Sequence, residues 1–251
     1  MTQPSGRTCS VPGCTAPARN SHSDRCEAHR QRQRRHGHPR QRTIGKALLR
    51  PYLARARTIV ERDQTGQLAG ALRQLHSLLG DHARQSVADG LSGRPGSKWD
   101  RIAGQEVAKV VDATDALDCA ALVGGLFLLR DDRPALFVSE EGFRFQLARL
   151  FRSQTDLAFG SYWDHETGRC KTVYRDLPPR ATATLARWVV EAYARFAAHL
   201  VAWDRRERSR QSDALGAIDA VFAAMQPDHQ PSSHQPSPAT GASSNLKETS
   251  L

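Results

Sequence analysis

The chain has 251 residues, a formal net charge of +10 and an isoelectric point near 9.9. This length suits one good-sized core with a small appended module, and the positive charge favours an acidic partner such as nucleic acid. Residues 1–13 lack the apolar stretch of a secretory signal. The longest apolar run, residues 119–129, is about half of what a bilayer crossing needs. We therefore expect a cytoplasmic protein, nucleoid-associated if it binds DNA, with no membrane contact.

The positive charge is concentrated at the start of the chain. Residues 1–50 carry eleven Lys or Arg against Asp24 and Glu27, a net charge of +9, so the other 201 residues hold 25 basic and 24 acidic groups, a net of +1. The predicted fold is mainly α, with an N-terminal zinc knuckle and a helical domain that contains one β-hairpin. The expected segments are a flexible lead-in (1–8), the knuckle with an arginine-rich arm (9–42), the helical domain (43–226) and a disordered tail (227–251).

The knuckle is predicted from the spacing C-x4-C-x11-C-x2-H, formed by Cys9, Cys14, Cys26 and His29. Two close pairs of sulfur and nitrogen ligands, separated by a loop, can surround a single tetrahedral zinc ion. Three cysteines within 26 residues of a cytosolic chain favour metal ligation over a disulfide framework. The alternatives are cysteines scattered in a disordered basic tail, or a fourth ligand supplied by His36 or His38.

The arm follows directly after the knuckle. From residue 25 to residue 50 there are nine Lys or Arg, and Glu27 is the one acidic residue among them. Runs of one charge sign repel themselves and normally indicate a polyanionic partner; DNA is the expected partner, and RNA is an alternative that these charges do not distinguish. The predicted nucleic-acid contacts are Arg30, Arg32, Arg34, Arg35, His36, Arg40, Arg42 and Lys46.

The segment CSVPGCTAPARNSHSDRCEAHRQRQRRHGHP, about 35 residues with its flanks, resembles the small zinc knuckles of phage-encoded and homing HNH endonucleases. The resemblance implies the same four ligands and an origin in a phage, plasmid or integrative element. The matching residues of the arm are Arg32, Arg34, Arg35, His36, Gly37 and Pro39. Arg30 and Gln33 stand where that family usually has aromatic residues, so we expect a looser, more electrostatic tether here.

Helical periodicity dominates the next part of the chain. Leucines at positions 68, 72, 75 and 79 predict a helix that ends near Gly80. Residues 98–131 are predicted to form one long helical stretch, bent at Gly124 and Gly125. Glu140 and Glu141, after Ser139, suit the first turn of another helix.

The strongest predicted helix runs from about residue 181 to residue 210, after Pro178 and Pro179. Its apolar stripe has heptad-like steps of four and three and consists of Leu185, Val189, Ala192, Phe196, His199 and Trp203. Further apolar residues widen this face beyond a narrow coiled-coil seam. We expect the helix to pack inside its own domain, with a homodimer through residues 181–210 as the alternative.

A β-hairpin is predicted over residues 160–176, with its turn at residues 166–168. Arg169, Lys171 and Arg175 share one face of the second strand. This basic stripe, with Tyr162 and Trp163 nearby, is either a second nucleic-acid contact or an ordinary solvated surface.

Catalytic patterns are incomplete. His165 is the one candidate start of an HNH nuclease motif, but no Asn lies between Asn20 and Asn245, and the next His, His199, is expected in a helix core. Phosphate-binding, dinucleotide-binding and HExxH motifs are missing, and Cys119 and Cys170 are interpreted as structural thiols. We therefore expect a non-enzymatic, zinc-dependent nucleic-acid-binding protein; the alternatives are an adaptor that binds an acidic protein partner and an unusual nuclease.

Overall fold

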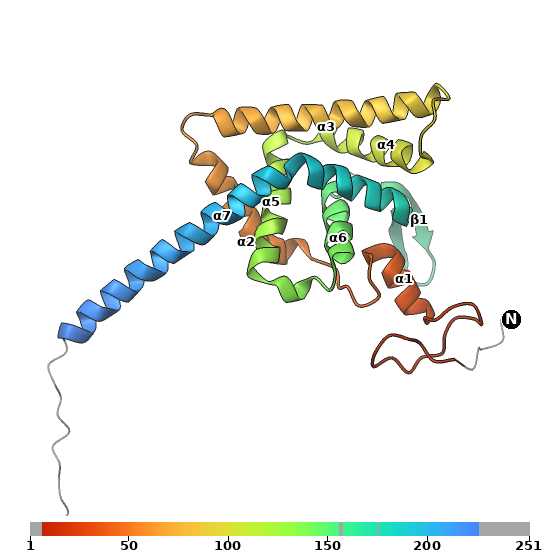
Figure 1. Ribbon diagram of the computed structural model, residues 1–251. Helices are drawn as coiled ribbons and strands as arrows, with labels where there is room; N and C mark the ends of the chain where they lie inside the picture. Colours follow the sequence, from red (N-terminus) through yellow and green to blue (C-terminus); the bar gives the residue numbers. More distant parts are fainter. Residues whose placement is uncertain (1–6, 156–157, 175, 226–251) are drawn as a thin grey trace, which may run out of the picture. The chain divides into compact units, whose positions relative to one another are not determined.

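The computed structural model describes residues 7–155, 158–174 and 176–225. These residues form a mainly α fold with a single β-hairpin, as predicted (Figure 1). The elements are α1 (Glu27–His36), α2 (Lys46–Glu61), α3 (Gln67–Leu91), α4 (Lys98–Ala113), α5 (Ala116–Asp132), the 3-10 helix η1 (Pro134–Leu136), α6 (Glu140–Arg152), β1 (Ala158–Asp164), β2 (Arg169–Tyr174) and α7 (Pro179–Met225).

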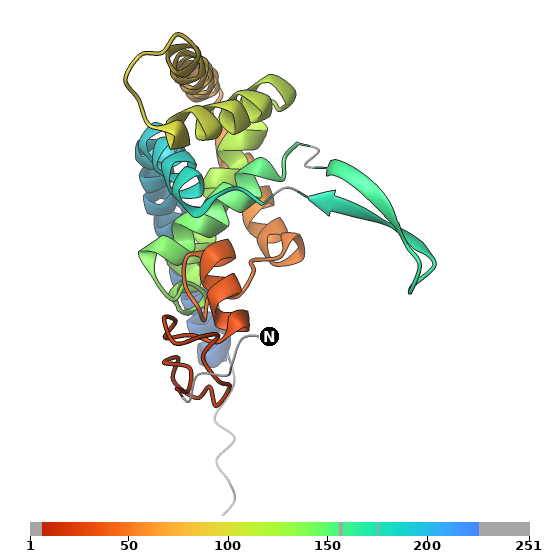
Figure 2. The ribbon, with the colours of Figure 1, turned by 90° about the vertical axis from the view of Figure 1, so that its right-hand side faces the viewer.

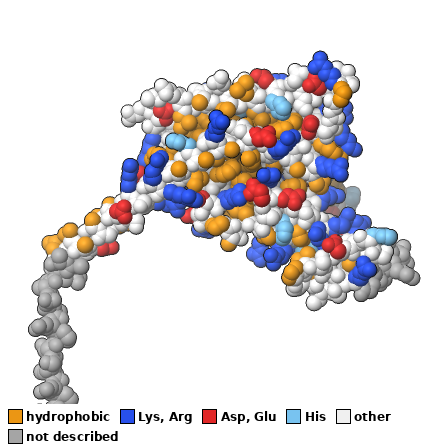
Figure 3. Space-filling model, viewed as in Figure 1, with side chains coloured by type: hydrophobic (Ala, Val, Ile, Leu, Met, Phe, Trp, Pro, Cys, Tyr) orange, Lys and Arg blue, Asp and Glu red, His pale blue; other side chains and the backbone are white. Residues whose placement is uncertain are grey.

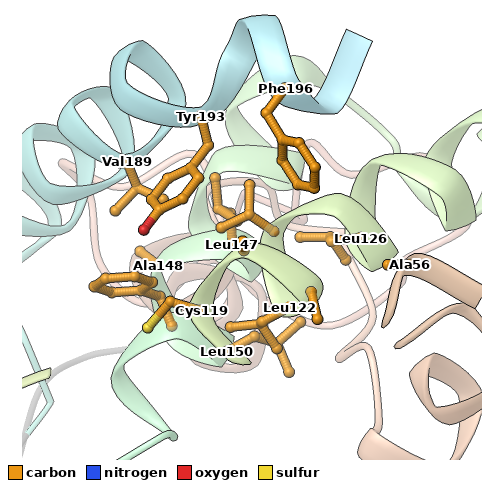
Figure 4. Close-up of a cluster of buried hydrophobic side chains, with 14 of the residues drawn as sticks. Ala56, Cys119, Leu122, Leu126, Leu147, Ala148, Leu150, Val189, Tyr193 and Phe196 are labelled. Atoms are coloured by element: carbon orange, nitrogen blue, oxygen red, sulfur yellow. The ribbon is translucent and has the colours of Figure 1, made fainter. Parts of the chain in front are cut away.

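The core is built around α5. This helix is apolar on nearly all sides, so it is stable only when other helices cover it. Leu122 and Leu126 of α5 meet Leu147 of α6 and Tyr193 of α7 in a close-packed cluster (Figure 4). Although α5 is the most apolar helix, none of the helices in the described ranges combines the length and the hydropathy needed to cross a membrane.

The single helix predicted over residues 98–131 is wrong, because the chain breaks between α4 and α5. Thr114 is extended, and the side chain of Asp115 accepts a hydrogen bond from the Leu117 amide at 2.7 Å, which starts a new helix. The expected bend at the two glycines does not divide α5. Gly125 instead allows α2 to approach, since a Cβ there would lie 3.1 Å from the backbone nitrogen of Leu53.

Two other helix boundaries were also tested by the structure. The helix expected to end at Gly80 continues to Leu91, and a Cβ at Gly80 would lie 2.7 Å from Val111. This glycine therefore provides room for a neighbouring helix and does not terminate its own. The start of α6 is confirmed, because Ser139 Oγ accepts a hydrogen bond from the Gly142 amide at 2.9 Å.

Helix α7 begins at Pro179 and extends beyond residue 210 to Met225. Leu185, Val189 and Phe196 are buried in the core, so the predicted packing inside the domain is confirmed for this face. The prediction that His199 lies in the core is wrong. His199 is exposed, and Leu200 is buried in its place. The buried face of α7 consists of positions 185, 189, 193, 196 and 200, which are three or four residues apart.

The hairpin pairs β1 with β2 in antiparallel fashion, with Trp163 opposite Cys170. Asp164 shapes the turn by accepting hydrogen bonds from the Glu166 amide and the Thr167 hydroxyl, and Gly168 adopts a φ of 60°. Figure 2 shows the hairpin standing out from the helices. Trp163 is 56% exposed.

Chain contacts divide the molecule into two units, residues 1–206 and residues 207–251. The described part of the second unit is the end of α7. Its exposed apolar residues are Leu215, Ile218, Val221, Phe222 and Met225. The predicted disordered tail, 227–251, and most of the predicted lead-in lie outside the described residues, and the segment boundaries stay predictions.

Candidate metal centre and basic arm

Cys9, Cys14, Cys26 and His29 converge on one point. Their ligand atoms all lie within 4.8 Å of one another. His29 Nδ1 lies 3.4 Å from Cys9 Sγ and 3.3 Å from Cys26 Sγ, and the sulfurs of Cys14 and Cys26 are 3.9 Å apart. A tetrahedral zinc ion with ordinary bond lengths would set its sulfurs about 3.8 Å apart and each sulfur about 3.5 Å from the nitrogen. The four side chains therefore lie close enough to hold one metal ion, and the three distances above are near those of a tetrahedral site.

Local backbone structure brings these ligands together. The Cys9 amide donates to Ala16, and the Cys14 amide donates to Val11 across a turn in which Gly13 has a φ of 80°. Cys26 is the N-cap residue of α1, which places His29 in the first helical turn. A turn thus positions Cys9 and Cys14, and the start of α1 positions Cys26 and His29.

The surroundings of the cluster shift the pKa values of two of its thiols in opposite directions. Burial raises the pKa of the Cys9 thiol, but backbone hydrogen bonds at Cys26 and Val11, together with side-chain hydrogen bonds to His29 and Cys14, outweigh burial and lower it to about 6. At Cys14 a backbone hydrogen bond lowers the pKa, and burial together with the neighbouring Cys9 and Cys26 more than reverses this, so the pKa is raised. A bound cation would relieve the mutual repulsion of the sulfurs.

His29, and neither of the two alternative histidines, completes the cluster. His38 Nδ1 instead accepts a hydrogen bond from the Arg40 amide. His36 lies against α6, where its Nδ1 is 3.1 Å from Gln146 Nε2.

Comparison with known proteins yields no match to a family model, a curated protein or a solved structure. The function of this chain is therefore inferred from its geometry and its charges.

Helix α1 forms the first part of the arm and contacts α6, so this part is an ordered helix; that the arm is looser than in the resembled family stays a prediction. Gly37 ends α1 with a φ of 75°, and its amide donates to Gln33. A Cβ at Gly37 would lie 2.8 Å from the carbonyl oxygen of Glu141, which leaves room only for glycine. Gln33, in the position of the missing aromatic, donates from its side chain to the Gly37 carbonyl and strengthens this helix end.

Two buried glutamines tie the arm to the body. Gln41 donates to the Leu136 carbonyl at 3.0 Å and accepts from the Val138 amide at 3.0 Å. Gln146 of α6 accepts from the Ile44 amide at 3.0 Å and contacts His36. Both side chains are fully buried, so breaking these bonds would leave polar groups without partners. Sequence reasoning missed this pair, since isolated glutamines carry no pattern.

His36 was predicted to contact nucleic acid. Burial, followed by the positive charges of Arg149, Arg32 and Arg35, lowers its pKa to about 4. The side chain is therefore neutral near pH 7 and serves the contact between α1 and α6.

The arm cations differ in their partners. Arg30 pairs with Glu27, and Arg34 and Arg35 both pair with Asp176. The remaining predicted contacts are exposed and form no ion pair with any described residue; they are Arg32, Arg40, Arg42 and Lys46. Figure 3 shows basic side chains gathered around the junction of the knuckle and the body.

The hairpin and the two cysteines outside the knuckle add no further site within the described residues. Arg169 is exposed, whereas Arg175 and the side chain of Lys171 lie outside the described residues, so the basic stripe stays a prediction. Cys170, which was interpreted as a structural thiol, is exposed and is not packed in the core. Cys119 is buried, which raises the pKa of its thiol to about 12. Exposed His165 belongs to no metal-ligand cluster within the described ranges.

Proposed function

We propose that this protein binds nucleic acid, DNA in the first instance, through α1 and the segment that follows it, and that a zinc ion in the Cys3His cluster holds this arm in place. The observation that carries the proposal is a short segment of exposed cations that form no ion pair within the part of the chain that the structure describes. From residue 28 to residue 60 the chain has no Asp or Glu. Such a surface is suited to a row of phosphates.

Zinc is the metal best suited to this donor set, because three thiolates and one imidazole nitrogen in tetrahedral geometry are typical of structural zinc sites. All four coordination positions come from the protein. The ion would therefore supply folding stability to the knuckle and leave no open position for substrate. This supports a structural role for the ion, with the binding chemistry left to the arm.

The second candidate is an adaptor that uses the same cations to bind an acidic protein. The spacing of the charges favours nucleic acid, because Arg32, Arg40, Arg42 and Lys46 are spread along a chain segment with no apolar side chain exposed between them to form the core of a protein interface. An origin in a phage, plasmid or integrative element belongs to the same proposal and rests on the resemblance of the knuckle.

The test is a mobility-shift titration of the full chain with duplex DNA across a range of salt, with and without a chelator. About six phosphate contacts would make the logarithm of affinity fall with the logarithm of salt at a slope of about −5. We expect about one zinc per chain, and we expect Cys26→Ala to lose both the metal and the shift. Cys170→Ala is the matched control and should change neither.

A triple variant, Arg32→Gln, Arg40→Gln and Arg42→Gln, should reduce the slope to about −3 because it removes about three of the six contacts. Its control removes the same charge from exposed positions outside the arm, at Arg73, Arg187 and Arg195. Equal losses in the two triple variants would contradict the proposal. Salt-insensitive binding to an acidic protein would favour the adaptor, and metal-dependent cleavage lost in His165→Ala would favour a nuclease.

A further inference from the structure

A cavity of about 400 Å³ lies where the end of α1 meets α6 and the first turn of α7. Four arginines line it, Arg34 and Arg35 from α1 and Arg149 and Arg152 from α6, and Asp176 is the single acidic residue among the lining side chains. Cavities of about 300 to 1,000 Å³ are typical of small-ligand sites. The volume therefore suits a phosphate together with an attached sugar, and the lining suits an anion.

The four guanidinium groups are not equally available. Arg152 is nearly buried and pairs with Glu106, with its Nε 2.7 Å from Glu106 Oε2, so it is committed to the fold. Arg149 donates to Gln146 at 3.1 Å but forms no ion pair with a carboxylate among the described residues. Burial lowers the pKa of Arg149, the negative charge of Asp176 partly offsets this effect, and the positive charge of Arg35 lowers the pKa further. Arg149 thus carries a half-buried charge that, within the described residues, is balanced by the field of Asp176 and by no ion pair.

Asp176 provides the negative charge that this cluster attracts. Its carboxylate lies 3.1 Å from Arg35 Nε and 3.6 Å from a terminal nitrogen of Arg34. All three side chains are about half exposed, and such ion pairs are weak because water screens them. A phosphate, which accepts several charge-assisted hydrogen bonds, is a stronger partner for two adjacent guanidinium groups than one exposed carboxylate. The start of α7, the positive end of its helix dipole, lines the same cavity through Thr182.

We propose that this arginine pocket binds one phosphate of the nucleic acid that lies along α1, and that the phosphate displaces Asp176 from Arg34 and Arg35. The proposal rests on the proposed function and adds a fixed anchoring point to it. Contacts to the sugar-phosphate backbone set the register of a protein on a nucleic-acid duplex. A phosphate held between α1 and α6 would therefore align the exposed cations of the arm with the phosphates that follow.

The experiment measures fluorescence anisotropy of a labelled duplex with the full-length protein across salt. Arg149→Gln should weaken binding about five-fold or more and reduce the salt slope by about 1. Asp176→Asn should strengthen binding several-fold, because it removes the competing carboxylate. Arg144→Gln is the control, since Arg144 lies on α6 outside the pocket and pairs with Glu140. The pocket is overturned if Arg149→Gln matches Arg144→Gln, or if Asp176→Asn weakens binding.

A second measurement uses the wild-type protein and does not depend on the stability of a variant. Arginine Nε–H signals are followed by NMR during titration with inorganic pyrophosphate and with the duplex. Shifts of the Arg149 and Arg35 signals with the duplex support the proposal. If these signals shift with neither the duplex nor pyrophosphate, the pocket is overturned. If the wild type binds no nucleic acid but the same signals respond to pyrophosphate, the proposed function fails and the pocket belongs to a free phosphorylated ligand.

Discussion

The knuckle and the helical core hold their structures by different means. Around Cys9 and Cys26 the buried apolar cluster contains one other residue, Val11, whereas the cluster around α5 joins side chains from six helices. The knuckle therefore depends on its ligands and a few backbone hydrogen bonds, and the body depends on apolar burial. The contrast leads us to expect that removal of a bound metal would unfold the knuckle and leave the helical body folded.

Removal of the metal should have the largest effect on this comparison. A chelator should abolish amide protection over residues 9–26, because structural zinc contributes about 10 kcal/mol or more to small sites of this kind. Protection in α5 should persist. Hydrogen exchange followed by mass spectrometry measures both regions in one sample, and simultaneous loss of protection in α5 would show that the two regions are not separate.

A core substitution should have the reverse effect. Leu126→Ala should lower the free energy of unfolding by about 2 to 5 kcal/mol, because Leu126 is fully buried where α5, α6 and α7 meet. Zinc content should stay at one per chain. Urea titration followed by circular dichroism gives the stability. Leu78→Ala, at a position 56% exposed, is the control and should change it by less than about 0.5 kcal/mol.

Glycines inside helices offer a finer comparison. Gly125→Ala should destabilise the body by about 1 to 3 kcal/mol, because the new Cβ would press on the backbone of α2 at Leu53. Gly70→Ala should stabilise it by up to about 1 kcal/mol, since Gly70 lies in α3 and a Cβ there would meet open space beyond the backbone of its own helix. Thermal unfolding of the two variants measures the difference, and a shift in the same direction for both would contradict the close packing of α2 on α5.

The smallest predicted effect concerns pH at the junction of the two regions. His36 has a pKa of about 4 in the folded chain against 6.5 when unperturbed, so the unfolded state binds more protons between these values. Its contribution to stability is present above pH 6.5 and is lost as pH falls toward 4. After allowance for solvent screening the loss is about 1 kcal/mol. Urea titrations of the wild type and of His36→Asn should converge across this range; a pH-independent difference would contradict the assignment.

The Cys3His cluster could be predicted from the sequence because two close pairs of Cys and His form a pattern that the backbone has few ways to satisfy. The start of α6 was also predictable, since Ser139 and the two following glutamates mark a helix N-terminus. The helical arm was not predicted, because Arg and Gln favour helix without leaving an apolar periodicity. The break before α5 was missed for the opposite reason: apolar spacing continues across it, although Asp115 carries the local signal of an N-cap.

Glycines gave the most misleading signals. Gly80 was interpreted as a helix end, but it allows Val111 to approach, and that requirement exists only once the tertiary structure is known. The same holds for the arginine pocket. Arg149 and Asp176 are 27 positions apart in the sequence and have no shared pattern, so only the fold brings them to the same cavity as Arg34 and Arg35.

The two glutamines that bond across the junction have a consequence for dissecting this protein. Gln41 lies after α1, yet two of its side-chain partners belong to the segment just before α6, and Gln146 bonds to Ile44 in the segment after α1. A fragment cut after residue 42 would expose these amides to water and discard the surface on which α1 rests. A fragment that preserves the native orientation of the arm must therefore keep α6 together with α7, whose apolar face packs in the same core, so the arm is not a detachable 40-residue finger.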